Sequence, residues 1–216
     1  MDSKRYHDAV LFDLDGTLIN TTPLILASFR HVEREHGGKR RAEQEWLSGL
    51  GTALRSQLRE YAADEAETDR MLETYRLFNR AYHDRLARPF PGVAELLGEL
   101  QRRRYKLAVV TSKSREMAQR GLKLFDLQEF FEGIVALEDT PSHKPEPAPL
   151  LLGAERLEVA AARALYVGDA PADAAAARAA GMAFAAALWG GLTILQELDG
   201  AVARLQQPAE LLELLP

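Results

Sequence analysis

The chain has 216 residues, and its 27 Lys and Arg against 32 Asp and Glu give a formal charge of −5. At ~100–150 residues per domain, this length indicates one large domain or a domain that carries an insertion. A hydrophobic content of 47% excludes a disordered chain, the acidic balance leaves no basic face for nucleic acid, and the absence of cysteine excludes disulfides and thiol chemistry.

Short apolar runs alternate with helix-length segments along most of the chain. The runs are bounded by turn-forming residues and predict strands over residues 9–14, 107–110, 134–136, 164–167 and 183–188. Helices are predicted over residues 91–103, 114–123, 147–157 and 171–180. Strands that alternate with helices form a parallel sheet covered on both faces, so we expect an α/β fold of the Rossmann-like type.

Residues 18–87 interrupt this alternation with a segment that has helical patterns and no strand pattern. A helix starts at Thr22-Pro23, and shorter helices are predicted over residues 46–50 and 52–61. Apolar side chains at three- and four-residue steps predict a final amphipathic helix, with the stripe Met71, Tyr75, Phe78, Tyr82 and Leu86. We therefore expect a small all-α domain of residues 18–87 inserted into an α/β core of residues 1–17 and 88–216.

The distribution of apolar residues also bears on the location of the protein. No apolar run approaches the ~20 residues that cross a bilayer. Residues 1–8 are polar and do not have the apolar segment of a signal peptide. We expect a soluble, cytoplasmic protein that binds neither membrane nor nucleic acid and is a monomer or a weak dimer.

Polar residues with catalytic potential stand at or after the ends of four predicted strands. They are Asp13 and Asp15 after the first strand, Thr111 and Ser112 after the second, Lys144 after the third, and Asp169 and Asp173 after the fourth. Each alone has an ordinary explanation as a turn, a helix cap or a solvated loop residue. In a parallel sheet the carboxyl ends of the strands share the edge at which ligands bind, so all seven can converge there.

Carboxylates gathered at this edge need a cation beside them. If Asp13, Asp15 and Asp169 lie within ~5 Å of one another, each pair repels by ~3 kcal/mol at an effective dielectric of about 20. A site made only of oxygen ligands, without His or Cys, selects Mg²⁺. Lys144 and the Thr111 hydroxyl would add a positive charge and a donor for a phosphoryl group, so the constellation indicates phosphoryl transfer.

The ordered motifs D-L-D-G-T-L, T-S, K-P and G-D-x-x-x-D resemble those of the haloacid dehalogenase superfamily, in its phosphatase branch. The resemblance implies a helical cap inserted after the first motif and an aspartyl-phosphate formed on Asp13, with Asp15 as general acid and then general base. It also implies that the phosphate is held by Thr111, the Ser112 backbone and Lys144. The implied Mg²⁺ ligands are Asp13, the Asp15 carbonyl and Asp169, with Asp173 as a further ligand or a neighbour of the ligands. Dehalogenase members lack an acid at the second position, so Asp15 favours a phosphate substrate.

Further stretches separate two capped groups of this family. D-L-D-G-T-L-I-N-T, Y-R-L-F-N, G-L-K and K-P-E-P together resemble the bacterial capped pyrophosphatases, whereas phosphoglycolate phosphatases typically continue D-G-T-L-x-D-S. We therefore expect a small phosphorylated substrate, with inorganic pyrophosphate first and phosphoglycolate second. Asn20 beside the hinge and Arg55 in the insertion are candidates for recognising the part of the substrate beyond the reacting phosphate.

A protein of another class, the signalling receiver domain, also phosphorylates an aspartate beside Mg²⁺, a Thr or Ser and a Lys. Receiver domains place the acceptor on a middle strand, lack an inserted cap and hardly turn over. The inserted segment and the second aspartate, two residues beyond Asp13, favour a hydrolase.

Overall fold

The computed structural model describes residues 6–37, 42–47, 49, 51–191 and 200–215, and its centre is a six-stranded sheet. All neighbouring strands are parallel, in the order β5-β4-β1-β6-β7-β8. The strands span β1 Ala9–Phe12, β4 Lys106–Val110, β5 Gly133–Val135, β6 Ala164–Gly168, β7 Ala183–Ala187 and β8 Ala203–Leu205. The five strands predicted from apolar runs are confirmed, whereas β8 was not predicted.

Helices cover both faces of this sheet. They span α5 Val93–Arg102, α6 Arg115–Leu124, α7 Ala148–Arg156, α8 Pro171–Ala179 and α9 Leu211–Leu214. Successive side chains of β1 point to opposite faces: Val10 and Phe12 pack with α5, α6 and α9, while Ala9 and Leu11 pack with α7 and α8. Short 3₁₀ turns lie at Gln128–Phe130, Leu137–Asp139, Ala161–Arg163 and Pro208–Glu210. The α/β, Rossmann-like fold is therefore confirmed.

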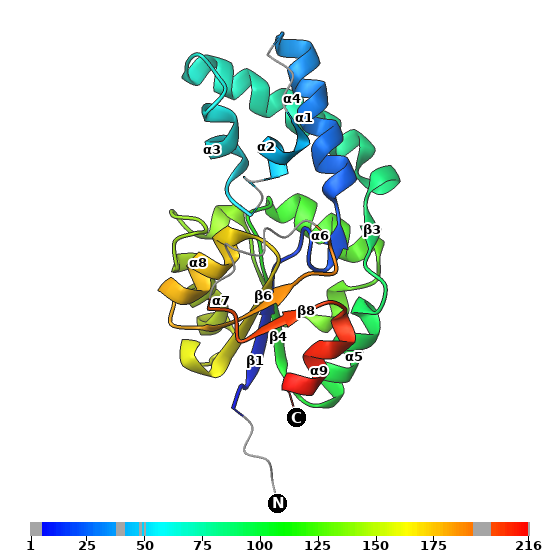
Figure 1. Ribbon diagram of the computed structural model, residues 1–216, viewed down its shortest axis with the longest axis vertical. Helices are drawn as coiled ribbons and strands as arrows, with labels where there is room; N and C mark the ends of the chain where they lie inside the picture. Colours follow the sequence, from blue (N-terminus) through cyan, green and yellow to red (C-terminus); the bar gives the residue numbers. More distant parts are fainter. Residues whose placement is uncertain (1–5, 38–41, 48, 50, 192–199, 216) are drawn as a thin grey trace, which may run out of the picture.

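Four further helices form a second layer at the top of Figure 1, beyond the carboxyl edge of the sheet. They span α1 Thr22–His36, α2 Glu43–Leu47, α3 Leu54–Arg59 and α4 Glu65–Leu86. These helices have a hydrophobic core of their own, in which Phe29 stacks on Trp46 at 4.2 Å and meets Tyr75 edge-on. Of the helix predicted over 46–50, residues 48 and 50 lie outside the described residues.

Two short strands join the helical layer to the sheet. β2 (Ile19–Asn20) pairs antiparallel with β3 (Arg88–Pro89), so the chain enters and leaves the four helices at one place. The sequence showed no strand pattern here, because two residues are too few for an alternation. This arrangement supports our proposed division into a core of residues 1–17 and 88–216 and a cap of residues 18–87. Among the described helices, none has the length and hydropathy required to cross a membrane.

The buried face of α4 differs in part from the predicted stripe. Met71 and Tyr75 are buried as expected, but Tyr82 is 38% exposed. Asn79 and His83 are buried instead: Asn79 donates a hydrogen bond to the Ser28 hydroxyl of α1 at 3.3 Å, and the His83 ring lies beside Gly121 of α6 in the core. Buried polar residues such as these interrupt the apolar spacing, so the spacing of apolar residues does not predict this part of the buried face.

Candidate active site

The polar residues expected to converge do lie at one edge of the sheet. Asp13 directly follows β1, Thr111 follows β4 and Asp169 follows β6, and these are three adjacent parallel strands. Lys144 comes from the loop before α7, and Asp173 lies in the first turn of α8. The strand order therefore brings together residues that are up to 160 positions apart in sequence.

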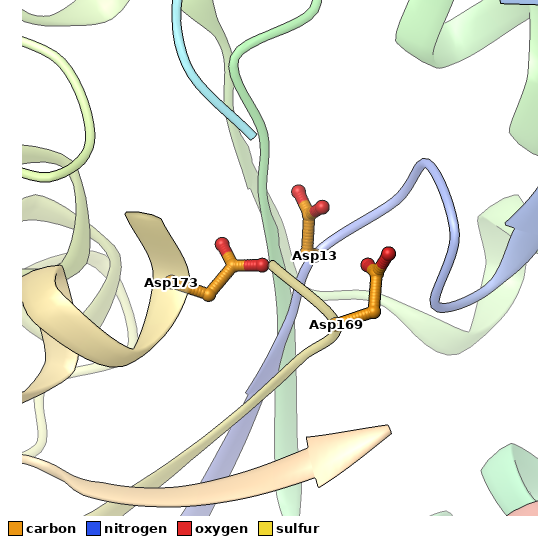
Figure 2. Close-up of side chains that lie close together, drawn as sticks. All are labelled: Asp13, Asp169 and Asp173. Carbon is orange, nitrogen blue, oxygen red and sulfur yellow. The ribbon is translucent and has the colours of Figure 1, made fainter. Parts of the chain in front are cut away.

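Three carboxylates form the centre of this group (Figure 2). Asp13, Asp169 and Asp173 each offer an oxygen, and these oxygens lie within 4.8 Å of one another. All three residues are buried, with 3%, 5% and 0% of their surface exposed, respectively. Asp173 also caps α8, because its Oδ2 accepts a hydrogen bond from the Ala170 amide at 3.0 Å.

Lys144 connects two of these carboxylates. Its Nζ donates to Oδ1 of Asp13 at 2.8 Å and to Oδ1 of Asp173 at 2.7 Å. Its third contact, at 3.0 Å, is the hydroxyl of Tyr166, which itself donates to the Val110 carbonyl. The ammonium is thus buried with every donor used, as a buried charge requires.

Burial and mutual repulsion shift the pKa values of this group. Burial raises the pKa of Asp13 to about 7, and the nearby Lys144 charge opposes that rise. Burial and the charges of Asp13 and Asp173 raise the pKa of Asp169 well above its ordinary value. Burial alone would lower the pKa of Lys144, but the two carboxylates it contacts outweigh this and raise it. The cluster thus holds more negative charge than its one lysine neutralises.

The donor set fits a divalent cation. When ionised, three carboxylates against one ammonium leave two negative charges in excess, which one Mg²⁺ would balance. Asp169 has no ion-pair partner among the described residues, and the hydrogen-bond donor it has is the Thr17 hydroxyl, 2.8 Å from Oδ1. Oxygen ligands in a small, buried cluster suit Mg²⁺.

Asp15 stands apart from this cluster, which corrects the expectation that its carboxylate would join Asp13 and Asp169. Its Oδ1 accepts a hydrogen bond from the Thr21 hydroxyl at 2.6 Å. Lys113 contacts both carboxylate oxygens, at 2.7 and 2.8 Å. Lys113 and Thr21 thus hold the Asp15 carboxylate, while Asp173 takes the third place among the clustered carboxylates.

The residues after β4 divide their contacts between core and cap. Thr111 is buried, and its Oγ1 accepts a hydrogen bond from the Lys113 amide at 3.2 Å. The Ser112 hydroxyl instead donates to the Gly51 carbonyl of the cap at 2.6 Å. Ser112 thus has its side chain engaged by the cap, which is compatible with a role for its backbone alone.

A cavity of about 350 Å³ lies between core and cap above these residues. The core contributes acidic, hydroxyl and basic side chains, among them Asp13, Asp15, Thr111 and Lys113. The cap wall is mixed and includes Phe29, Tyr75, Arg76, Asn79 and Arg80. The cavity is large enough for a small phosphorylated compound and is closed on one side by the cap.

The two cap candidates from the sequence do not line this cavity. Arg55 is about half exposed and forms ion pairs with Asp69 at 2.6 Å and Glu65 at 2.9 Å on the outer surface of the cap. The Asn20 side chain accepts a hydrogen bond from the amide of Thr22, the first residue of α1. Both expectations therefore require correction, because neighbouring polar groups of the cap engage these two side chains.

Sequence reasoning missed Lys113 and Tyr166. Lys113 reads as an ordinary loop lysine, and Tyr166 reads as a core residue of a buried strand. The available signal was position: Lys113 follows Thr111 and Ser112, and Tyr166 lies three residues before Asp169.

The comparisons with known proteins agree with this architecture. The fold combines an α/β core, whose first strand ends in an acidic motif, with helices inserted directly afterwards. The family described as haloacid dehalogenase-like hydrolase matches residues 10–187, and the chain belongs to this family. The expected family and the assignment as a hydrolase of the phosphatase type are thus confirmed, and a receiver domain is disfavoured.

Individual relatives cover most of the chain. A protein of Caldanaerobacter subterraneus subsp. tengcongensis with the provisional name pyrophosphatase PpaX is 45% identical over 84% of this chain and 81% of its own length. Pyrophosphatase PpaX of Halalkalibacterium halodurans is 41% identical over 75% of this chain and 74% of its own. A crystal structure from Lactobacillus plantarum, provisionally described as a phosphoglycolate phosphatase, has a TM-score of 0.87 at 28% identity and covers 96% of this chain and 99% of that one.

Proposed function

We propose that this hydrolase cleaves inorganic pyrophosphate with Mg²⁺, through an aspartyl-phosphate on Asp13. One observation supports this most strongly. Lys144 holds Oδ1 of Asp13, and among the described residues no side chain donates to Oδ2. Asp13 lines the cavity, so we assign the attack on phosphorus to this second oxygen.

The proposed reaction has two half-reactions. In the first, Oδ2 of Asp13 forms a bond to phosphorus while the bond to the leaving oxygen breaks, and Asp15 gives that oxygen a proton. In the second, Asp15 takes a proton from water, the water oxygen bonds to phosphorus, and the bond to Asp13 breaks. Inorganic phosphate leaves and Asp13 is restored as a carboxylate.

The Thr111 hydroxyl and the Ser112 backbone amide would donate hydrogen bonds to the equatorial phosphoryl oxygens, which carry most of the charge in the transition state. Lys144 would add positive charge beside the phosphoryl group while it holds Oδ1 of Asp13. Mg²⁺ held by Asp13, Asp169, the Asp15 carbonyl and Asp173 would neutralise further negative charge on the phosphoryl oxygens. Tyr166 keeps Lys144 in place through its hydroxyl.

Pyrophosphate is supported by the relatives that carry the name pyrophosphatase at 41–45% identity. Phosphoglycolate is the second candidate, because a structural relative with nearly complete overlap carries that name. Both compounds are small enough for the cavity, and both carry a second anionic group beyond the phosphate to be transferred.

The test is phosphate release from a panel of pyrophosphate, phosphoglycolate, sugar phosphates and nucleotides, compared by kcat/KM with Mg²⁺ and with EDTA. We expect the highest kcat/KM for pyrophosphate, no release in EDTA and no turnover by Asp13→Asn. Asp126→Asn is the matched control, since Asp126 is exposed and asparagine tolerates its positive φ. A higher kcat/KM for phosphoglycolate would make phosphoglycolate the assigned substrate in place of pyrophosphate. Turnover by Asp13→Asn would show that Asp13 is not the nucleophile.

A further inference from the structure

Lys113 lines the cavity together with Asp13, the proposed nucleophile, and Asp15, the proposed general acid. It contacts both carboxylate oxygens of Asp15, and its side chain is 11% exposed. It lines the same cavity as Asp13 and is presented by the loop that also carries Thr111. A charge on this loop therefore lies beside Asp15, where the leaving group of a substrate attached to Asp13 must be.

The hydrogen bonds of this pair leave room for a ligand. A lysine ammonium has three donors, and at most two are used by the two oxygens of Asp15. Asp15 has a second donor, the Thr21 hydroxyl, so its orientation does not depend on Lys113 alone. Lys113 can therefore bind an additional acceptor while Asp15 stays in place.

Two other cations, Arg76 and Arg80, line the cavity from α4. Arg80 pairs with Glu116, and because both side chains are about 60% exposed, solvent screens their charges. Arg76 has no ion-pair partner among the described residues. Lys113 is nearly buried and adjoins Asp15, which makes it the cation placed to touch the leaving group itself.

We propose that Lys113 binds the anionic leaving group and so determines the substrate class: phosphate compounds whose leaving group carries its own negative charge. This inference rests on the proposed function, in which Asp15 protonates the leaving oxygen. The same ammonium would hold Asp15 and the leaving group side by side. Phosphate monoesters whose leaving group is neutral lack this contact and are therefore poorer substrates.

The first test is a ratio of kcat/KM values, pyrophosphate or phosphoglycolate over 2-hydroxyethyl phosphate. The last compound replaces the carboxylate of phosphoglycolate by a neutral alcohol. In Lys113→Met the ratio should fall by about 10–100-fold, the range for one hydrogen bond to a charged group. Lys113→Gln keeps a donor for Asp15 without the charge and should show the same fall. Lys123→Met, on the exposed side of α6, is the control with equal charge change and should keep the wild-type ratio.

The outcomes separate a specificity role from a positioning role. If both rates fall alike in Lys113→Met and Lys113→Gln, Lys113 only fixes Asp15 and the inference is wrong. Unchanged rates on both substrates also contradict it. A thermal melt of each variant shows whether it is folded.

A second measurement does not need turnover. Calorimetric binding of methylenediphosphonate and of methylphosphonate, both with Mg²⁺, compares a ligand that has a second anionic group with one that does not. We expect Lys113→Met to raise the Kd of methylenediphosphonate by a factor at least tenfold larger than the factor by which it raises the Kd of methylphosphonate. Equal weakening would overturn the assignment, even if the wild-type protein released no phosphate from pyrophosphate and the proposed function had failed.

Discussion

The Nζ atom of Lys144 lies 2.8 Å from Oδ1 of Asp13, and the two side chains expose only 1% and 5% of their surface. The same ammonium contacts Asp173, so a single lysine neutralises part of a buried acidic cluster. Removing one partner of a buried ion pair leaves the other charge without compensation, which is costly. We therefore expect Lys144 to contribute both to the stability of the fold and to catalysis.

Lys144→Met should lower the free energy of unfolding by about 3 kcal/mol, measured with urea at pH 7 in EDTA, because Asp13 and Asp173 lose their counter-charge. Its phosphate release should fall at least 100-fold with Mg²⁺ present. Lys123→Met is the surface control for both measurements. Wild-type rates in Lys144→Met would reduce Lys144 to a structural residue.

Asp15→Asn should slow both half-reactions. The amide keeps an acceptor for Thr21 but cannot transfer the proton, so each step should fall by about 10²–10⁴-fold. Rapid-quench measurements of phosphoenzyme formation and breakdown report the two steps separately. Asp126→Asn serves as the control. Unaltered rates for both steps would exclude Asp15 as acid and base.

Substituting alanine for Gly51 tests the contact between cap and core. The φ of Gly51 is +84°, and an added Cβ would lie 2.8 Å from the Cβ of Ala170. Gly37 also has a positive φ, +69°, but its added Cβ would meet nothing within 4 Å. Alanine at either site should cost about 1–2 kcal/mol of stability through backbone strain. Only Gly51→Ala should also raise KM, because it displaces the cap loop from the core.

Equal kinetics of the two glycine variants would contradict a role for this contact in substrate binding. Thermal melts of both proteins give the shared stability loss, and KM for pyrophosphate gives the difference. The hydrogen bond from the Ser112 hydroxyl to the Gly51 carbonyl is the interaction expected to break.

Asp139 should make stability depend on pH. Burial opposes its ionisation, but hydrogen bonds from the Ala136 amide, Arg156 and Arg115 outweigh this and lower its pKa from 3.8 to about 2. A folded-state pKa below the unfolded value gives stability that is present above about pH 4 and is lost as the pH falls toward 2. Asp139→Asn should thus cost about 2 kcal/mol at pH 7.

Urea unfolding of wild type and Asp139→Asn at pH 7, 5 and 3 measures this difference, which should shrink only below about pH 4. The control is Asp8→Asn, because Asp8 pairs with Arg163 on the surface and both side chains are more than 40% exposed. Its effect should stay below about 1 kcal/mol. A difference for Asp139→Asn that stayed constant from pH 7 to pH 3 would contradict the lowered pKa.

Much of the fold could be predicted from the sequence because buried parallel strands leave continuous apolar runs. Residues 9–12 and 164–168 are buried throughout, so their position in the sheet follows from hydrophobicity alone. The convergence of Asp13, Thr111 and Asp169 followed from the shared edge of the strands. β8, with an exposed arginine at its centre, and the two-residue strands β2 and β3 carry no such pattern.

The site could be predicted less completely, because pairing depends on three-dimensional neighbours. Lys113 becomes important only since β4 lies next to β1, which places it against Asp15. Arg55 faces acidic residues of α4 that its own stretch of sequence does not reveal. The position of Asp173 in the first turn of a helix predicts that it caps the helix, and it does so. Its carboxylate also belongs to the cluster with Asp13 and Asp169, which the helix position does not reveal.

The most direct test of the central claim is a crystal structure of the protein with Mg²⁺ and beryllium fluoride, which mimics a phosphoryl group on a carboxylate. We predict a fluoroberyllate bonded to Oδ2 of Asp13, with Lys144 still donating to Oδ1 of Asp13, Thr111 donating to a fluorine, and Mg²⁺ beside Asp169. An ordered Mg²⁺ together with an Asp13 carboxylate that carries no fluoroberyllate would contradict the covalent mechanism.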